Sequence, residues 1–107
     1  MAKNEIWKII PNAKDKYMIS SFGRVMSPSG YIRKLYQWKS GYLGIGIIMK
    51  SGKRRILRVH RLVAEAFIPN PDNKTQVNHK NGDKTDNRVE NLEWCDAKYN
   101  SNYGTGK

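Results

Sequence analysis

Three polar residues near the end of the chain could share one chemical site. His79 is one of two histidines, and a neutral imidazole can take up a proton at about pH 7. Asn91 follows His79 by 12 residues, and Asn100 follows Asn91 by 9. If His79 lies on one strand, Asn91 begins the next and Asn100 lies in a helix, a hairpin packed on that helix would bring the three residues together.

The residues around this trio indicate such a hairpin and helix. Residues 76–80, QVNHK, alternate like a strand, and Asn81-Gly82 is a turn dipeptide. Residues 91–95, NLEWC, alternate again. Asp96 is a good N-cap for a short helix, and Gly104 is a good C-cap. The end of the chain is therefore predicted to run strand, loop, strand, helix.

The N-terminal half is predicted to consist of short strands joined by turns. Glycine, proline and serine separate apolar or alternating runs that have the length of strands. The expected strands are residues 5–10, 17–20, 24–27, 31–38, 42–49 and 54–59. The next run, residues 60–67, has apolar residues at helical spacing, which predicts a short amphipathic helix. Pro69 and Pro71 would end it.

The charge of the chain favours a polyanionic partner. Its 20 lysines and arginines outnumber 9 acidic residues, which gives a formal net charge of +11 over 107 residues. Nucleic acid, an anionic membrane or an acidic protein would each suit such a field. No apolar run approaches the roughly 20 residues of a membrane span, and the start of the chain lacks an apolar signal-peptide core. We therefore expect a soluble cytoplasmic protein with no membrane partner.

Six basic residues concentrate this charge between residues 50 and 61. No acidic residue interrupts them, and such a run either contacts DNA phosphates or forms only a solvated surface. We predict phosphate contact, although strand alternation would separate Arg54 and Arg58 from Arg55. The predicted DNA-binding residues are Lys50, Lys53, Arg54, Arg55, Arg58 and Arg61.

The small number of cysteines and histidines limits the kinds of metal site that the chain can form. Cys95 is the only cysteine, so no intrachain disulfide can form, and we expect it to be a small core residue. One cysteine and two histidines fall short of a four-ligand zinc site, so no structural zinc is expected. A bound metal should be a hard ion with oxygen or mixed ligands. His60 opens the predicted helix and is expected to be structural, with contact to DNA or to the site as the alternative.

At this point the chain resembles a known family. The run VHRLVAEAFIPNPDNKTQVNHKNGDKTDNRVENLEWCDAKYN is similar to the HNH homing-type endonucleases of phages and introns. The family's His, Asn and third His-or-Asn positions fall on His79, Asn91 and Asn100. The earlier words EIWKII and YMISSFGRVMS resemble the NUMOD-type motif that often precedes such domains. Together the resemblances cover roughly residues 5–103.

The resemblance implies a fold and a division of the chain. The expected class is α+β, with an N-terminal β-rich region followed by a ββα-metal motif. Residues 1–50 would form the NUMOD-like, DNA-contacting region. Residues 51–107 would form the HNH nuclease region, and the two together would make one compact domain.

The resemblance also implies roles for single residues. His79 would be the general base, and Asn91 would orient the loop and His79 by hydrogen bonding. Asn78 and Asn100 would be the ligands of one divalent metal, with Mg²⁺ expected first and Mn²⁺ second. Some members of the family have an aspartate at the position of Asn78, and a neutral amide binds a cation less strongly than a carboxylate does.

The function implied is metal-dependent hydrolysis of phosphodiester bonds in double-stranded DNA. The protein would nick one strand or cleave both, as a monomer or a homodimer, and would be encoded by a phage or an intron. An HNH scaffold that only binds DNA is the first alternative, because Asn78 replaces a carboxylate. A basic RNA-binding protein is the second alternative, which the charge allows but the spacing of His79, Asn91 and Asn100 does not explain.

Overall fold

Short antiparallel strands make up most of the regular structure between residues 4 and 96, the part of the chain that the computed structural model describes. One sheet contains β1 (Trp7–Ile9), β2 (Met18–Ser20) and β3 (Val25–Met26), in that order. A second contains β4 (Tyr36–Gln37), β5 (Leu43–Ile48) and β6 (Arg54–Arg58). The strands β7 (Gln76–His79) and β8 (Leu92–Cys95) pair as a hairpin.

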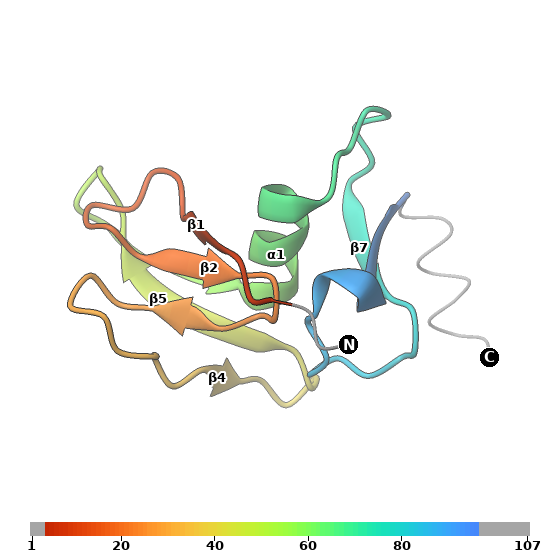
Figure 1. Ribbon diagram of the computed structural model, residues 1–107, viewed down its shortest axis with the longest axis horizontal. Coiled ribbons are helices and arrows are strands. Elements are labelled where there is room, and N and C mark those ends of the chain that lie inside the picture. The colour runs from red at the N-terminus through yellow and green to blue at the C-terminus, as the bar shows by residue number, and fades with distance from the viewer. Residues whose placement is uncertain (1–3, 97–107) are drawn as a thin grey trace.

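The helix α1, Val59–Phe67, lies between the N-terminal sheets and the β7–β8 hairpin (Figure 1). It begins directly after β6 and contacts β2, β5, β6, β7 and β8. Its apolar residues recur at helical spacing and give it one buried face. The helix confirms the prediction for residues 60–67 with one added residue, and sheets combined with a helix confirm the α+β class.

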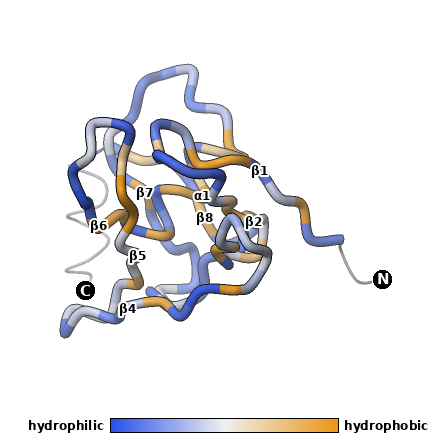
Figure 2. The backbone as a smooth tube through the Cα atoms, turned by 90° about the vertical axis from the view of Figure 1, so that its left-hand side faces the viewer, coloured by the Kyte–Doolittle hydropathy of each residue, from blue (hydrophilic) through white to orange (hydrophobic). Residues whose placement is uncertain are grey.

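The hydrophobic core gathers around α1. On β5, Ile45 and Ile47 alternate with glycines and point inward, 2% and 1% exposed. Each isoleucine buried in this way stabilises the fold by about 1.5 to 3 kcal/mol. In Figure 2 hydrophobic stretches mark the strands beside α1, whereas the outer loops are mostly hydrophilic. The core consists of Ile10, Ala13, Ile19, Val25, Ile45, Ile47, Val59, Leu62, Val63, Ala64, Val77 and Leu92.

Two strand predictions differ from the structure. Of the strand predicted over 31–38, only Tyr36–Gln37 forms β4. The backbone N–H of Arg33 donates to the Val25 carbonyl, and Ile32 makes a single bridge to Met26. The chain therefore stays beside β3 before it reaches the second sheet.

Asn91 does not open β8 as predicted. It ends a 3₁₀ turn, η1 (Val89–Asn91), in which its N–H donates to the carbonyl of Arg88. The helix predicted to follow Asp96 lies outside the described residues. No helix within residues 4–96 is long and apolar enough to cross a membrane.

Candidate active site

His79 is the last residue of β7 and is almost wholly buried, with 4% of its surface exposed. Its Nε2 lies 2.6 Å from Oδ1 of Asn87. An amide oxygen can only accept a hydrogen bond, so Nε2 carries the proton of the neutral ring and Nδ1 is the basic nitrogen. This contact defines both the orientation of the ring and its tautomer.

Asn91 closes the loop that leads from His79 to η1. Its Nδ2 donates to Oδ1 of Asn81 at 3.0 Å and to the backbone oxygen of Asp86 at 2.8 Å. Its Oδ1 accepts from the backbone N–H of Asn81 at 3.1 Å, and its carbonyl accepts from the backbone N–H of Lys80 at 2.8 Å. Asn91 thus shapes this loop, whereas the amide that holds the ring of His79 belongs to Asn87.

Asn87 was not among the residues that the sequence pointed to. The segment NGDKTDNRVEN contains three asparagines, and nothing in their spacing assigns one of them to His79. Packing separates them: Asn87 is buried with 3% exposed, Asn91 is buried against the loop, and Asn81 is exposed. Only the folded arrangement identifies the partner of the histidine.

Asn78 precedes His79 and is also buried, with 5% exposed. It lies opposite Glu93 of β8, and its Nδ2 donates to Oε2 of Glu93 at 2.8 Å. Because the amide nitrogen is engaged by the carboxylate, Oδ1 is the atom of Asn78 that can turn towards a cation. The sequence did not single out Glu93, which places a carboxylate beside the neutral amide.

Asn78 and Glu93 would bind a metal through oxygen atoms, the ligand type that Mg²⁺ and Mn²⁺ prefer. Within residues 4–96 no group of three or more histidine, cysteine, aspartate or glutamate side chains could hold a metal by itself. The predicted ligand Asn100 lies outside the described residues. The amide oxygen of Asn78 and the carboxylate of Glu93 therefore fit a hard divalent ion as part of a ligand set, not as a complete one.

The rings of His60 and Tyr42 pack beside the ring of His79. His60, from the first turn of α1, lies 5.1 Å from His79 between ring centroids. Tyr42, just before β5, stacks on His60 at 4.9 Å and lies 5.9 Å from His79. His60 is 6% exposed, and its buried Nδ1 has no hydrogen-bond partner among residues 4–96. Three segments far apart in sequence thus meet at one cluster.

Burial lowers the pKa of His60 from 6.5 to about 3, with smaller contributions in the same direction from His79, Arg58 and Arg61. The folded protein therefore keeps His60 neutral throughout the physiological range. A neutral ring beside His79 places no positive charge against the candidate base.

Acidification should destabilise the protein through His60. The unfolded chain binds a proton at His60 below about pH 6.5, whereas the folded chain excludes it until about pH 3, so stability falls as pH falls through this window. Each pH unit below 6.5 removes about 1.4 kcal/mol, so His60 alone contributes a loss of about 2 kcal/mol at pH 5. Urea unfolding at pH 7 and pH 5 measures it. His60→Phe should lose this part of the pH dependence, and an unchanged dependence would contradict the assignment.

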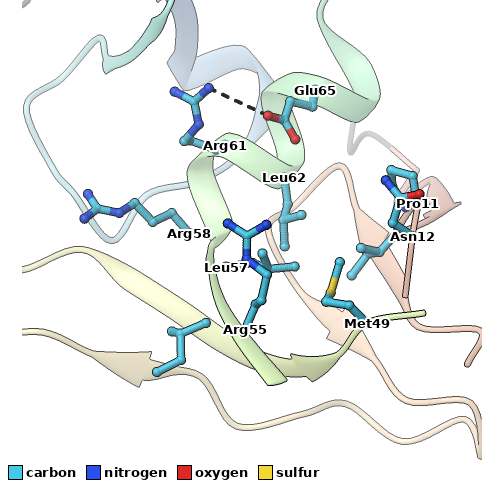
Figure 3. A pocket seen from close by; sticks show the side chains of 11 residues that line it. Pro11, Asn12, Met49, Arg55, Leu57, Arg58, Arg61, Leu62 and Glu65 are labelled. Carbon is cyan, nitrogen blue, oxygen red and sulfur yellow. Dashed lines mark ion pairs between the residues drawn. The ribbon is translucent and has the colours of Figure 1, made fainter. Parts of the chain in front are cut away.

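The six predicted DNA-binding residues do not share one surface. Arg54 and Arg58 alternate with Arg55 along β6, Lys50 and Lys53 flank the turn before it, and Arg61 lies on α1. Arg55, Arg58 and Arg61 border a hollow of about 370 Å³ between β6 and α1, which also contains Leu62 and Glu65 (Figure 3). His79 does not line this hollow.

Two cations lie near the histidine cluster. The guanidinium of Arg58 is 5.9 Å from the ring centre of Tyr42. The Nζ of Lys84 is 4.8 Å from the same ring and donates to the Ser40 carbonyl at 2.9 Å. Lys84 was not predicted, because its position depends on the loop after β7 folding back over Tyr42.

Comparison with known proteins shows the family to which this chain belongs. Residues 57–102 match the family model of HNH endonucleases, and residues 5–62 match the NUMOD4 motif. The chain belongs to the HNH endonuclease family, with a NUMOD4 motif in its N-terminal half. The resemblance inferred from the sequence is thereby confirmed.

The similar proteins include viral and phage endonucleases. "Uncharacterized HNH endonuclease L247" of Acanthamoeba polyphaga mimivirus is 44% identical over 101 residues, covering 92% of this chain and 25% of that protein. "DNA endonuclease I-HmuI" of Bacillus phage SP01 is 39% identical over 95 residues, covering 88% of this chain and 54% of that enzyme.

A solved structure described as "DNA binding and cleavage by the HNH homing endonuclease I-HmuI" has the same fold. It superimposes with a TM-score of 0.78 at 36% identity, covering 94% of this chain and 59% of that chain. The chain thus spans about a quarter of the mimivirus protein and about half of the phage enzyme. This likeness confirms the HNH fold that the resemblance implied.

Proposed function

We propose that this chain provides the catalytic site of a DNA endonuclease that hydrolyses phosphodiester bonds in double-stranded DNA. The observation that carries the proposal is the buried His79, whose Nε2 is held by Asn87 at 2.6 Å. That bond leaves Nδ1 as a base of defined direction. The printed descriptions of I-HmuI, a DNA endonuclease that binds and cleaves DNA, support the choice of substrate.

The proposed reaction begins with a water molecule beside the scissile phosphate. Nδ1 of His79 accepts a proton from this water as its oxygen attacks phosphorus, and the bond from phosphorus to the 3′ oxygen breaks. Asn87 accepts from the Nε2 proton throughout, so it stabilises the imidazolium that forms and keeps the ring in place. The leaving 3′ oxygen takes up a proton from solvent water, so the products are a 5′ phosphate and a 3′ hydroxyl.

A divalent ion, Mg²⁺ or Mn²⁺, would neutralise charge on the phosphate and on the leaving 3′ oxygen when bound. We propose Asn78 and Asn100 as its ligands. The carboxylate of Glu93, which accepts a hydrogen bond from Asn78, would add negative charge beside the ion. Asn91 is proposed to position the loop that follows His79.

The basic residues are proposed to bind the phosphate backbone. Lys50, Lys53, Arg54, Arg55, Arg58 and Arg61 remain the candidate DNA contacts, and Lys84 joins them because of its place over Tyr42. We also propose that the region of residues 1–50 contributes some of the DNA contacts and that the region of residues 51–107 contains the cleavage site.

A plasmid nicking assay tests the function. Supercoiled plasmid is incubated with the protein and Mg²⁺, Mn²⁺ or EDTA, and the nicked product is then treated with DNA ligase. We expect nicking with either metal, none with EDTA, and resealing by ligase, which requires a 5′ phosphate beside a 3′ hydroxyl. Nicking in EDTA, or nicks that ligase cannot seal, would contradict the proposed chemistry.

A module that binds DNA without cleaving it is the second candidate. It is favoured by Asn78, a neutral amide that already donates to Glu93. Duplex binding in the absence of nicking under every metal condition would select this alternative.

Substitution of Arg58 should weaken DNA binding in a salt-dependent way. Arg58 is exposed, so a phosphate can reach it, and Arg58→Gln should reduce the slope of log affinity against log salt by about 0.9 per lost phosphate contact. Fluorescence anisotropy with a labelled duplex measures the slope. Arg88→Gln is the matched control, because Arg88 is exposed but already pairs with Asp86 and Glu90. Equal slopes for Arg58→Gln and the wild type would remove Arg58 from the interface.

A further inference from the structure

The turn between β2 and β3 approaches the histidine site from the N-terminal half of the chain. The N–H of Gly23 donates to the carbonyl of Ser20 at 3.0 Å, and Gly23 has a φ of +87°. The hydroxyl of Ser20 accepts from the N–H groups of Phe22 at 3.1 Å and Arg24 at 3.0 Å. Ser20 is completely buried, so its hydroxyl is sheltered from water and these bonds hold the turn in one shape.

Gly23 packs directly on Asn87. A Cβ built at Gly23 would lie 2.8 Å from Cβ of Asn87 and 3.1 Å from its backbone oxygen. The backbone N–H of Val89 also donates to the carbonyl of Ser21 at 3.0 Å, which joins the same two segments. The turn therefore contacts the backbone and Cβ of Asn87, the parts of that residue that cannot swing aside.

We infer that the Ser20–Arg24 turn is a positioning device for His79 and that Gly23 is its contact residue. The inference rests on the proposed function, because it gives the turn a role in orienting the proposed base. Gly23 touches Asn87, and Asn87 holds Nε2 of His79 at 2.6 Å. Gly23, in the segment that matches NUMOD4, thus fixes the position of Asn87, in the segment that matches the HNH endonuclease family.

The close packing of Gly23 on Asn87 makes the hydrogen bond from His79 to Asn87 sensitive to a side chain at position 23. A methyl group at Gly23 would lie too close to Cβ of Asn87, so the turn or the Asn87 segment must shift, and no flexible chain end lies at the contact to absorb the change. The bond from Asn87 to His79 then lengthens or bends, and hydrogen bonds weaken steeply with such changes. Misplacement of a catalytic group by about 1 Å can lower a rate about 100-fold.

The chain contains a matched control for the turn. Residues 27–30 form a second turn in which the N–H of Gly30 donates to the carbonyl of Ser27 at 2.9 Å. Gly30 has a φ of +98°, so alanine is strained there as it is at Gly23, but a Cβ at Gly30 would meet no atom within 4 Å. Gly30→Ala therefore reproduces the backbone strain without the contact to Asn87.

Kinetics of Gly23→Ala and Gly30→Ala provide the first test. We expect Gly23→Ala to lower kcat for nicking at least 10-fold, with KM for DNA within 2-fold of the wild type. Gly30→Ala should match the wild type in both constants. Equal losses in the two variants would overturn the inference, because strain alone would then explain the effect, and so would an unchanged kcat in Gly23→Ala.

A second readout does not depend on cleavage. The proton on Nε2 of His79, held by Asn87, should give a resolved NMR resonance that correlates with the ring ¹⁵N nuclei. We expect this resonance in the wild type and in Gly30→Ala, and its shift or loss in Gly23→Ala. If the wild type shows the expected resonances but does not nick DNA, the proposed function fails while the positioning inference stands. An unchanged resonance in Gly23→Ala overturns the inference whatever the activity.

A milder pair of variants decides the matter if Gly23→Ala does not fold. Ser20→Ala removes the hydroxyl that organises the turn, and no clash replaces it. Ser27→Ala removes the equivalent hydroxyl, which accepts from the N–H of Tyr31 at 3.3 Å in the control turn. Ser20→Ala should weaken the His79 resonance and lower kcat several-fold, whereas Ser27→Ala should do neither. The same effects from both serines, or from neither, would contradict the inference.

Discussion

Replacement of His79 by alanine is expected to lower the rate constant for plasmid nicking about 10²- to 10⁴-fold, the usual contribution of a general base. The physical reason is that Nδ1 of His79, the proposed acceptor of the proton from water, is lost. DNA affinity should change little, because the proposed contacts with the phosphate backbone are made by lysines and arginines and not by His79. Single-turnover nicking and duplex anisotropy measure the two quantities.

Two further variants make this test specific. His79→Phe keeps a ring in the cluster with His60 and Tyr42 but has no nitrogen, so it should be as inactive as His79→Ala. Free imidazole should restore part of the rate in His79→Ala, where a cavity remains, and none in His79→Phe. Gln76→Ala, on the same strand, should keep the wild-type rate. Full activity in His79→Ala would assign the cleavage to another group.

The largest expected loss of stability comes from Asn91→Ala. The change removes three hydrogen bonds of the buried side chain, two to Asn81 and one to the backbone oxygen of Asp86. Unpaired groups at a buried site cost about 1 to 3 kcal/mol each, and Asn81 is exposed enough to recruit water, so we expect a total of about 2 to 3 kcal/mol. The melting temperature should fall on the order of 10 °C.

An exposed asparagine in another loop serves as the control for Asn91. Asn70 also closes a loop, with its Nδ2 donating to the Lys74 carbonyl at 2.8 Å and its Oδ1 accepting from the Lys74 N–H at 2.9 Å. Water can replace both bonds there, so Asn70→Ala should cost less than about 1 kcal/mol. Calorimetry compares the two variants. A loss at Asn91 no larger than the loss at Asn70 would show that the loop closure contributes little.

The elements of the fold were largely predictable from local patterns. The alternation of residues 76–80 and 91–95, and the helical spacing of residues 60–67, depend on which side of each element faces the core. These patterns act over a few residues, so they can be read without knowing the partner surface. The strand predicted over residues 31–38 was too long, because residues 31–35 lie beside β3, as the bond from the Arg33 N–H to the Val25 carbonyl shows, and only Tyr36–Gln37 forms β4.

The site was predictable in part. The family to which the chain belongs was predicted from the order and spacing of residues, and the choice of His79 as the candidate base came from the same pattern. The partner of His79 did not, because Asn87, Asn81 and Asn91 have the same chemistry and differ only in what packs against them. The same holds for Lys84, whose place over Tyr42 is a tertiary contact between distant segments. Local sequence indicates which groups are available, and the packing of distant segments decides which of them meet.

The contact between Gly23 and Asn87 also bears on how such genes can recombine. NUMOD and HNH segments look like modules that could be exchanged between proteins at the point where the two matches meet, at residues 57–62. A crossover there would combine the Ser20–Arg24 turn of one protein with the Asn87 loop of another. Any side chain at position 23 would then clash with the residue at position 87. If the turn positions Asn87 as we infer, we expect a crossover to preserve activity only where the incoming turn has glycine at this position.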